Sequence, residues 1–178
     1  MSDYRRYFRP GGTYFFTLVL EDRKQSLLTD HIGILREAFA ETKRRYPFET
    51  LAICVLPDHL HWLMRLPEQD ADYPIRIRLF KTLFSKRLPE SCRRQNASKQ
   101  KRGDLGIWQR RFWEHAIRDE GDLARHMDYV YFNPVKHGYV ENVADWPFSS
   151  FHRDVESGLY CQDWGSGIAQ EIRDLYPE

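Results

Sequence analysis

Apolar and polar residues alternate along this chain in patterns that predict a mixture of strands and helices. Residues 13–20 are β-branched and aromatic and follow Pro10-Gly11-Gly12, which favours a strand. From Leu28 to Tyr46, apolar residues recur at spacings of four and three, and Pro47 follows. This spacing places them on one face of an amphipathic helix that ends before the proline.

The same two periodicities continue through the rest of the chain. Further strands are expected at 48–56, 59–66 and 112–119, and further helices from Pro74 to about Leu88 and from Gly121 to about Lys136. The short Pro57-Asp58 link makes the second and third strands an antiparallel hairpin. Residues 89–106 are polar and basic and are expected to form a mobile loop. Because proline disfavours helical geometry in the preceding residue, Pro134 should loosen the last helix at Asn133.

The resulting order β-α-β-β-α-β-α predicts an α+β fold of the ferredoxin-like, split β-α-β type. We expect an antiparallel sheet of four to five strands with helices on one face, the other face free, and an extra C-terminal helix that carries Tyr129. At 178 residues, one domain is the default. We place it at residues 1–152, followed by an acidic C-terminal extension at 153–178.

The formal net charge of +1 hides a strong asymmetry. Residues 76–111 contain twelve Lys or Arg and two acids, whereas residues 138–178 contain eight acids and two bases. A basic centre with an acidic tail favours a polyanionic partner, most commonly nucleic acid, although a basic loop that is merely solvated gives the same count. The candidate phosphate contacts are Arg76, Arg78, Lys81, Lys86, Arg110 and Arg111.

Other features of the sequence narrow the class of protein. No apolar run approaches the length that spans a bilayer, and the first residues lack the apolar segment of a signal peptide. Three widely separated cysteines make no disulfide framework. We therefore expect a cytoplasmic protein with no membrane partner.

Candidate chemistry begins at His59-Leu60-His61. Side chains alternate along a strand, so both imidazoles face the same way and could clamp a metal ion. Two histidines on a solvated face are the alternative. On the last helix, Asp122, His126, Tyr129 and Asn133 form a polar stripe beside the apolar stripe of Leu123, Met127 and Val130.

These groups suit phosphodiester chemistry. Two imidazoles and an amide oxygen give three protein ligands for a divalent cation and leave open positions for a phosphate. A tyrosine can form a covalent phosphotyrosyl intermediate that conserves the bond energy for rejoining. The alternative is an ordinary polar helix face that carries a packed tyrosine.

Several ordered motifs resemble one family. Pro57-Asp58-His59-Leu60-His61 is similar to the HUH motif of single-tyrosine DNA transposases. The segments at 9–17, 108–118, 129–135 and 146–150 resemble the REP-associated tyrosine transposases, so the resemblance covers about residues 8–152.

The resemblance implies a metal-dependent, single-strand-specific DNA endonuclease and strand transferase that acts on palindromic hairpin repeats. By position it makes His59, His61 and Asn133 metal ligands for Mg²⁺ or Mn²⁺ and Tyr129 the nucleophile. Tyr131 is the rival nucleophile, but it lies beside the apolar stripe, so we favour Tyr129. His126 could orient Tyr129 or the phosphate. His115 is in phase with Trp113 and Ile117, which favours a core position over a supporting role at the site.

Some alternatives stay open at this point. A catalytically silent hairpin DNA-binding protein or an RNA-binding protein would share the basic segment, though the latter leaves the histidines unexplained. DNA-sequence readers could lie at 89–106 or at Tyr4, Arg5 and Arg6. The acidic extension could cover the basic cleft and restrain activity. We expect a monomer, with a dimer as the alternative.

Overall fold

The computed structural model describes residues 8–94, 99, 101 and 103–166, and its centre is one antiparallel sheet. The strands are β1 (Thr13–Val19), β2 (Glu49–Val55), β3 (His59–Arg65) and β4 (Trp113–Ala116), in the order β2-β3-β1-β4. The register pairs Thr17 with His61 and Phe15 with His115, and β2 carries an irregularity between Thr50 and Ala52. The predicted α+β class and the 57–58 hairpin are confirmed.

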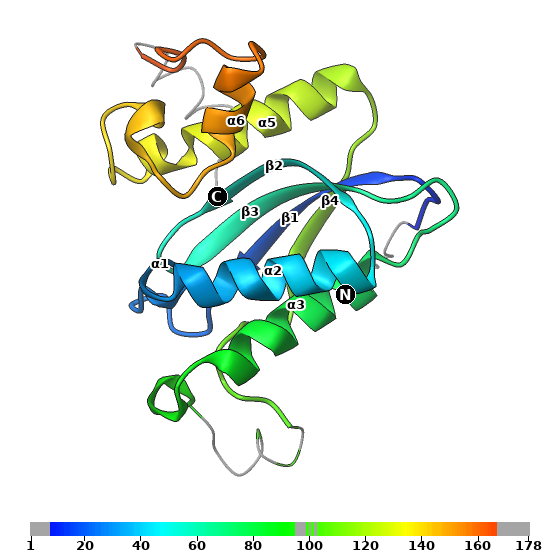
Figure 1. Cartoon of the computed structure of the whole chain (residues 1–178), viewed down its shortest axis with the longest axis vertical. Helices are drawn as coiled ribbons and strands as arrows, with labels where there is room; N and C mark the ends of the chain where they lie inside the picture. Colours follow the sequence, from blue (N-terminus) through cyan, green and yellow to red (C-terminus); the bar gives the residue numbers. More distant parts are fainter. Residues whose placement is uncertain (1–7, 95–98, 100, 102, 167–178) are drawn as a thin grey trace, which may run out of the picture.

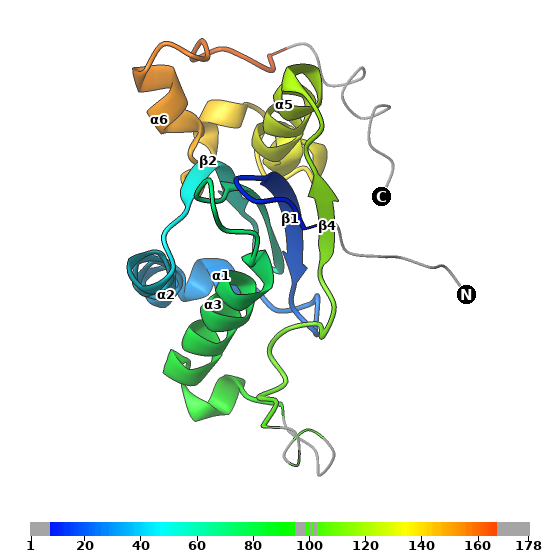
Figure 2. The ribbon, with the colours of Figure 1, turned by 90° about the vertical axis from the view of Figure 1, so that its right-hand side faces the viewer.

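Helices lie on both faces of the sheet. Figures 1 and 2 show α2 (Ile32–Arg45) and α3 (Tyr73–Arg87) on one side, and α5 (Glu120–Lys136) with α6 (Phe151–Glu156) on the other. The described residues also form three short helices: α1 (Leu27–Asp30) and two 3₁₀ helices at Glu90–Cys92 and Val143–Asp145.

Strand alternation divides the apolar side chains between two cores. Phe16, Leu60 and Trp62 point toward α2 and α3, whereas Phe15 and Leu63 point toward α5 and α6. Because both faces are covered, the residues of β3 from His59 to Met64 are all buried. This explains why the strand reads as nearly continuous apolar sequence rather than as clean alternation.

Three expectations need correction. The second sheet face is not free, because the C-terminal helix α5 and α6 pack on it. The helix expected from Leu28 to Tyr46 is interrupted at His31, which separates α1 from α2. Pro134 does not loosen α5 at Asn133, since the helix continues to Lys136 and is closed by a hydrogen bond from the His137 amide to the Asn133 carbonyl.

Parts of three segments discussed above cannot be compared with the structure. Residues 95–98, 100 and 102 of the expected basic loop, the N-terminal readers Tyr4 to Arg6, and 167–178 of the acidic extension lie outside the described residues. The boundary that we place at residue 152 falls within α6, whose Phe151 is part of the second core. In the part of the chain that the model covers, no helix has the length and apolar character needed to span a membrane.

Arg76 is part of the fold. Its side chain is 1 % exposed, and its guanidinium donates to the carbonyls of Pro47 and Asp72 and to the carboxylate of Asp70. Arg78, two residues further along α3, is exposed. Of the two arginines, only Arg78 presents its charge to solvent.

Replacing Arg76 with alanine is expected to lower the free energy of unfolding by about 3 kcal/mol, because the Asp70 carboxylate and two carbonyls lose their partner. Urea denaturation followed by circular dichroism measures the change. The matched Arg78→Ala variant should stay within about 0.5 kcal/mol of wild type. Equal stability of the two variants would contradict the structural role of Arg76.

Candidate functional site

The sequence-predicted histidines lie side by side on β3 and face α5. The rings of His59 and His61 have centroids 5.0 Å apart, and both side chains are almost completely buried. The ring of His61 also stacks on Phe15 of β1, at 5.4 Å between centroids. Their shared face follows from the strand period of two, as the sequence indicates.

Each imidazole is oriented through its Nδ1 atom. The Nδ1 of His59 lies 2.7 Å from the Asp58 carboxylate, and the Nδ1 of His61 lies 3.0 Å from the Thr17 hydroxyl. Burial would raise the pKa of Asp58, but hydrogen bonds from His59 and from Arg23 hold it well below its usual value. Because Asp58 is a carboxylate, the Nδ1 of His59 donates to it, and the Nε2 is left to act as a ligand.

Helix α5 brings Tyr129 and Asn133 to the same place. The Tyr129 ring lies 5.1 Å from the His61 ring and 5.8 Å from Phe15, between centroids. The ammonium of Lys136 lies 5.1 Å from the centre of the Tyr129 ring. One helical turn after Asn133, the ring of His137 lies 5.2 Å from the ring of His59, between centroids. The pattern of four residues between Tyr129, Asn133 and His137 therefore aligns all three with the histidine pair.

Two buried groups in this site have unmet polar atoms. Among the described residues, the Nε2 of His61 and both polar atoms of the Asn133 side chain form no hydrogen bond of good geometry. Such groups are rare in folded proteins because desolvation without a partner is costly. The Asn133 side chain lies close enough to His61 to favour the charged form of its ring weakly. Burial, together with nearby His59 and His137, holds the pKa of His61 well below its usual value, so the ring is neutral. A neutral imidazole and an amide oxygen are groups that can bind a divalent cation.

Tyr131, the rival nucleophile, is placed in the second core. Its side chain is fully buried, and its hydroxyl donates to the Asp154 carboxylate at 2.5 Å and lies 3.1 Å from the Ser150 hydroxyl. Burial and the Asp154 carboxylate raise its pKa far above the usual value. This hydroxyl therefore links α5 to α6 by a buried hydrogen bond.

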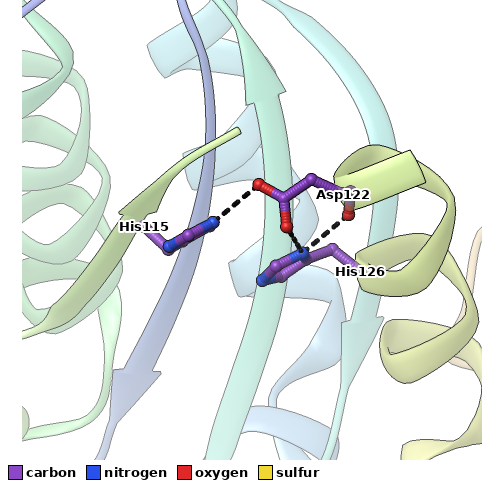
Figure 3. Close-up of side chains that lie close together, drawn as sticks. All are labelled: His115, Asp122 and His126. Atoms are coloured by element: carbon purple, nitrogen blue, oxygen red, sulfur yellow. Dashed lines mark hydrogen bonds and ion pairs between the residues drawn. The ribbon is translucent and has the colours of Figure 1, made fainter. Parts of the chain in front are cut away.

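A second cluster of ligand-type side chains joins β4 to α5. His115, Asp122 and His126 place their ligand atoms within 4.8 Å of one another, which makes the cluster a candidate metal site by spacing (Figure 3). The Nε2 of His115 lies 2.8 Å from the Asp122 carboxylate, and the Nδ1 of His126 lies 2.8 Å from the Asp122 carbonyl. The half-buried ring of His115 is therefore not the core residue that its phase in the strand favours.

The rings of this cluster are stacked. The planes of His115 and His126 are 11° from parallel, with centroids 4.7 Å apart. A metal ion lies in the plane of each imidazole at about 2.1 Å, so two parallel rings cannot both bind one ion until one of them rotates. As placed, the cluster is a hydrogen-bonded pair of histidines held by a buried carboxylate.

Most of the basic residues predicted to contact phosphates lie beside α3 and the segment before β4. Arg78, Lys81 and Arg110 border a cleft of about 510 Å³ between α3 and the segment before β4. Lys81 and Arg110 also border an adjoining hollow with Lys86. The ammonium of Lys81 donates to the Gln109 carbonyl, and burial lowers its pKa to about 8. Arg111 is exposed nearby, whereas Arg76 is occupied within the fold.

Comparison with known proteins places this architecture in a family. Residues 11–131 match the family model described as "Transposase IS200 like". The chain belongs to the IS200-like transposase family. A relative from Haemophilus influenzae, provisionally named a REP-associated tyrosine transposase, is 61 % identical over 97 % of this chain and 98 % of its own. The REP-associated tyrosine transposase of Escherichia coli K12 is 48 % identical over 94 % and 93 % of the two chains.

A solved structure supports the same assignment for the fold. A REP-associated tyrosine transposase bound to a REP hairpin superposes with a TM-score of 0.80, at 48 % identity, over 93 % of this chain and 92 % of that one. The resemblance inferred from the motifs is thereby confirmed, and this IS200-like transposase is a homologue of enzymes that cut and join DNA.

The sequence patterns do not identify every residue at the candidate site of this IS200-like transposase. Thr17 reaches His61 only through the register of β1 against β3, which no local pattern reveals. His137 could have been found, because it follows Asn133 by four residues. Asp58 lies in the quoted motif, but its role as the partner of His59 depends on the turn geometry.

Replacing Tyr131 with phenylalanine is expected to lower the free energy of unfolding of this IS200-like transposase by about 1–3 kcal/mol, because the buried Asp154 loses its shortest hydrogen bond. Thermal or urea unfolding measures the difference. Tyr139, which is 44 % exposed, supplies the matched control, and its phenylalanine variant should be close to wild type. A Tyr131→Phe protein as stable as the control would refute this packing role.

Proposed function

We propose that this protein is a metal-dependent single-stranded DNA endonuclease and strand transferase that acts on REP-type hairpins through a 5′-phosphotyrosine intermediate. The observation that carries the proposal is the convergence of Tyr129 and Asn133 of α5 on the buried ring of His61. Family membership supports the reaction class.

The residues that would hold a divalent cation are His59 and His61 through Nε2, and Asn133 through its amide oxygen. The buried polar atoms of His61 and Asn133 form no hydrogen bond of good geometry among the described residues, which fits such a role. Bound there, Mg²⁺ or Mn²⁺ would neutralise charge on the phosphate oxygens as a Lewis acid. Asp58 and Thr17 hold the two rings in place, so little reorganisation is needed on binding.

Tyr129 would attack the scissile phosphate. The phenol gives up its proton as the bond from its oxygen to phosphorus forms and the bond from phosphorus to the 3′ oxygen breaks. The departing 3′ oxygen takes up a proton and becomes a free 3′ hydroxyl. The 5′ end remains on Tyr129 until a 3′ hydroxyl attacks and reverses these changes. The positive charge of Lys136 near the ring favours the negative charge that develops on the phenol.

The proposal of a hairpin substrate is based on a solved structure of a homologue. A REP hairpin is bound in the solved structure of the REP-associated tyrosine transposase. In this chain, Arg78, Lys81, Lys86 and Arg110 would contact stem phosphates, because they border the clefts beside α3. Arg111, exposed and next to Arg110 in the sequence, would extend the same contact. Arg76 is left out, since its guanidinium is already used within the fold.

The domain at 1–152, the acidic extension, the monomeric state and the cytoplasmic location remain predictions. For the extension, deleting the whole of 153–178 would cut into α6 and remove Asp154, which binds Tyr131 of α5. It would also remove Tyr160, which binds Asp128 of α5, and Trp164, which contacts Phe151. A restraining role is therefore better examined by removing only residues 167–178.

Cleavage should depend on Tyr129 and on metal. With a labelled single-stranded REP hairpin and Mn²⁺, wild-type protein is expected to form a covalent adduct on a denaturing gel, and EDTA should abolish it. Tyr129→Phe should form no adduct, because the attacking oxygen is gone. Tyr131→Phe, assayed at a temperature where it is folded, is the matched control and should retain the adduct. An adduct in Tyr129→Phe would refute the assignment, and hairpin binding without cleavage by wild type would indicate a binding-only protein.

Metal affinity should depend on Asn133. Removing a ligand is expected to weaken Mn²⁺ binding at least about tenfold, so Asn133→Ala should bind more weakly than wild type in a titration followed by electron paramagnetic resonance. Asp122→Asn tests the second cluster and should leave this affinity unchanged. The reverse pattern would place the ion at His115, Asp122 and His126 and contradict the proposed ligands.

A further inference from the structure

Trp113 is an exposed aromatic residue on an open edge of the sheet. Its side chain is 54 % exposed, and β4 is the last strand in the order β2-β3-β1-β4. The opposite edge differs, because Ser149 bridges to Cys54 and the Phe148 carbonyl accepts from the Val55 amide. The edge that carries Trp113 is thus the more accessible of the two.

The indole continues a stack of flat rings. Trp113 and His115 are 6° from parallel with centroids 6.0 Å apart, and His115 in turn stacks on His126. Asp122 holds both imidazoles by hydrogen bonds, and its own amide donates to Asp119 at the start of α5. The two imidazoles that back Trp113 are therefore held by one carboxylate before any ligand arrives (Figure 3).

The stack lies next to the candidate catalytic site. Phe15 contacts Trp113 at 5.5 Å and His126 at 5.0 Å between ring centroids, and the same ring contacts His61 and Tyr129. On the other side of β4, the neighbouring residue Phe112 lines the basic cleft with Arg110. Trp113 therefore lies between the surface proposed for the stem and the proposed nucleophile.

Charge around the indole favours a nucleic acid strand. Arg110 and Arg111 come directly before β4 and are exposed. Arg118 follows the strand, where its side chain is 73 % exposed and lies 3.5 Å from the Asp122 carboxylate. An exposed aromatic face flanked by arginines combines base stacking with phosphate attraction, which is how sequence-tolerant single-strand sites are built.

We propose that Trp113, backed by His115 and His126, is a stacking platform for one unpaired base of the single strand that leads from the hairpin stem to the scissile phosphate. The platform orients the strand and touches none of the reacting atoms. This inference rests on the proposed single-strand substrate, but its test needs no cleavage.

The test measures hairpin affinity in EDTA, so that neither metal binding nor strand cleavage contributes. Fluorescence anisotropy compares three probes: the REP stem-loop alone, and the same hairpin with a short single-stranded flank at the 5′ end or at the 3′ end. Trp113→Ala is expected to weaken binding of one flanked probe by about 10- to 100-fold and to leave the stem-loop alone unchanged. Trp113→Phe should retain most of the affinity, because it keeps a flat ring.

A scan of abasic sites along the sensitive flank identifies the stacked base. At that position, the abasic probe should bind wild type and Trp113→Ala equally, because the contact is already missing. Leu159→Ala is the control, since Leu159 is also an exposed apolar residue, at 62 %, and lies beyond α6. It should bind all probes as wild type does.

Three results would overturn the platform: equal affinity of Trp113→Ala and wild type for every probe, an equal loss on the stem-loop alone, or a flank in which no single abasic site removes the difference. Failure of wild type to cleave would refute the proposed function and leave this result intact.

Discussion

The structure depends on the alternation of side chains along two strands that are buried on both faces. In β3, Leu60 and Trp62 anchor the core against α2 and α3, while His59 and His61 face α5. Buried imidazoles are costly unless their nitrogens have partners, and Asp58 supplies one of them. A one-residue slip of the register would exchange the two faces, so the packing of the core also fixes the face on which the candidate site lies.

Helix α5 completes the candidate site, because its repeat of about 3.6 residues decides which side chains pack on the sheet and which face the histidines. Val130 lies on the stripe that packs against the sheet, and Tyr129 and Asn133 follow the adjacent stripe to the histidines. Asp122 links the start of this helix to β4 through His115. The helix is thus attached to the sheet near both ends, which holds the tyrosine at a defined distance from the rings.

Local patterns in the sequence predict most of the strands and helices, because period two and period 3.6 are strong in this chain. They also indicate His59, His61, Tyr129 and Asn133 as one group, which the structure brings together. What they miss depends on contacts between distant segments. Helices on the second sheet face, the link from Thr17 to His61 and the burial of Arg76 all depend on tertiary packing. A basic residue in a basic segment gives no local sign that its charge is already paired.

The short hydrogen bond from Tyr131 to Asp154 has a consequence for how the site is assembled. Arg153, next to Asp154, donates to the carbonyls of Thr50 and Leu51 in β2, so α6 ties the tyrosine-bearing helix to the sheet of its own chain. Histidines and tyrosine then come from a single polypeptide. Contacts that lie within one polypeptide do not weaken on dilution, so the packing of Tyr129 beside the two histidines has no concentration threshold.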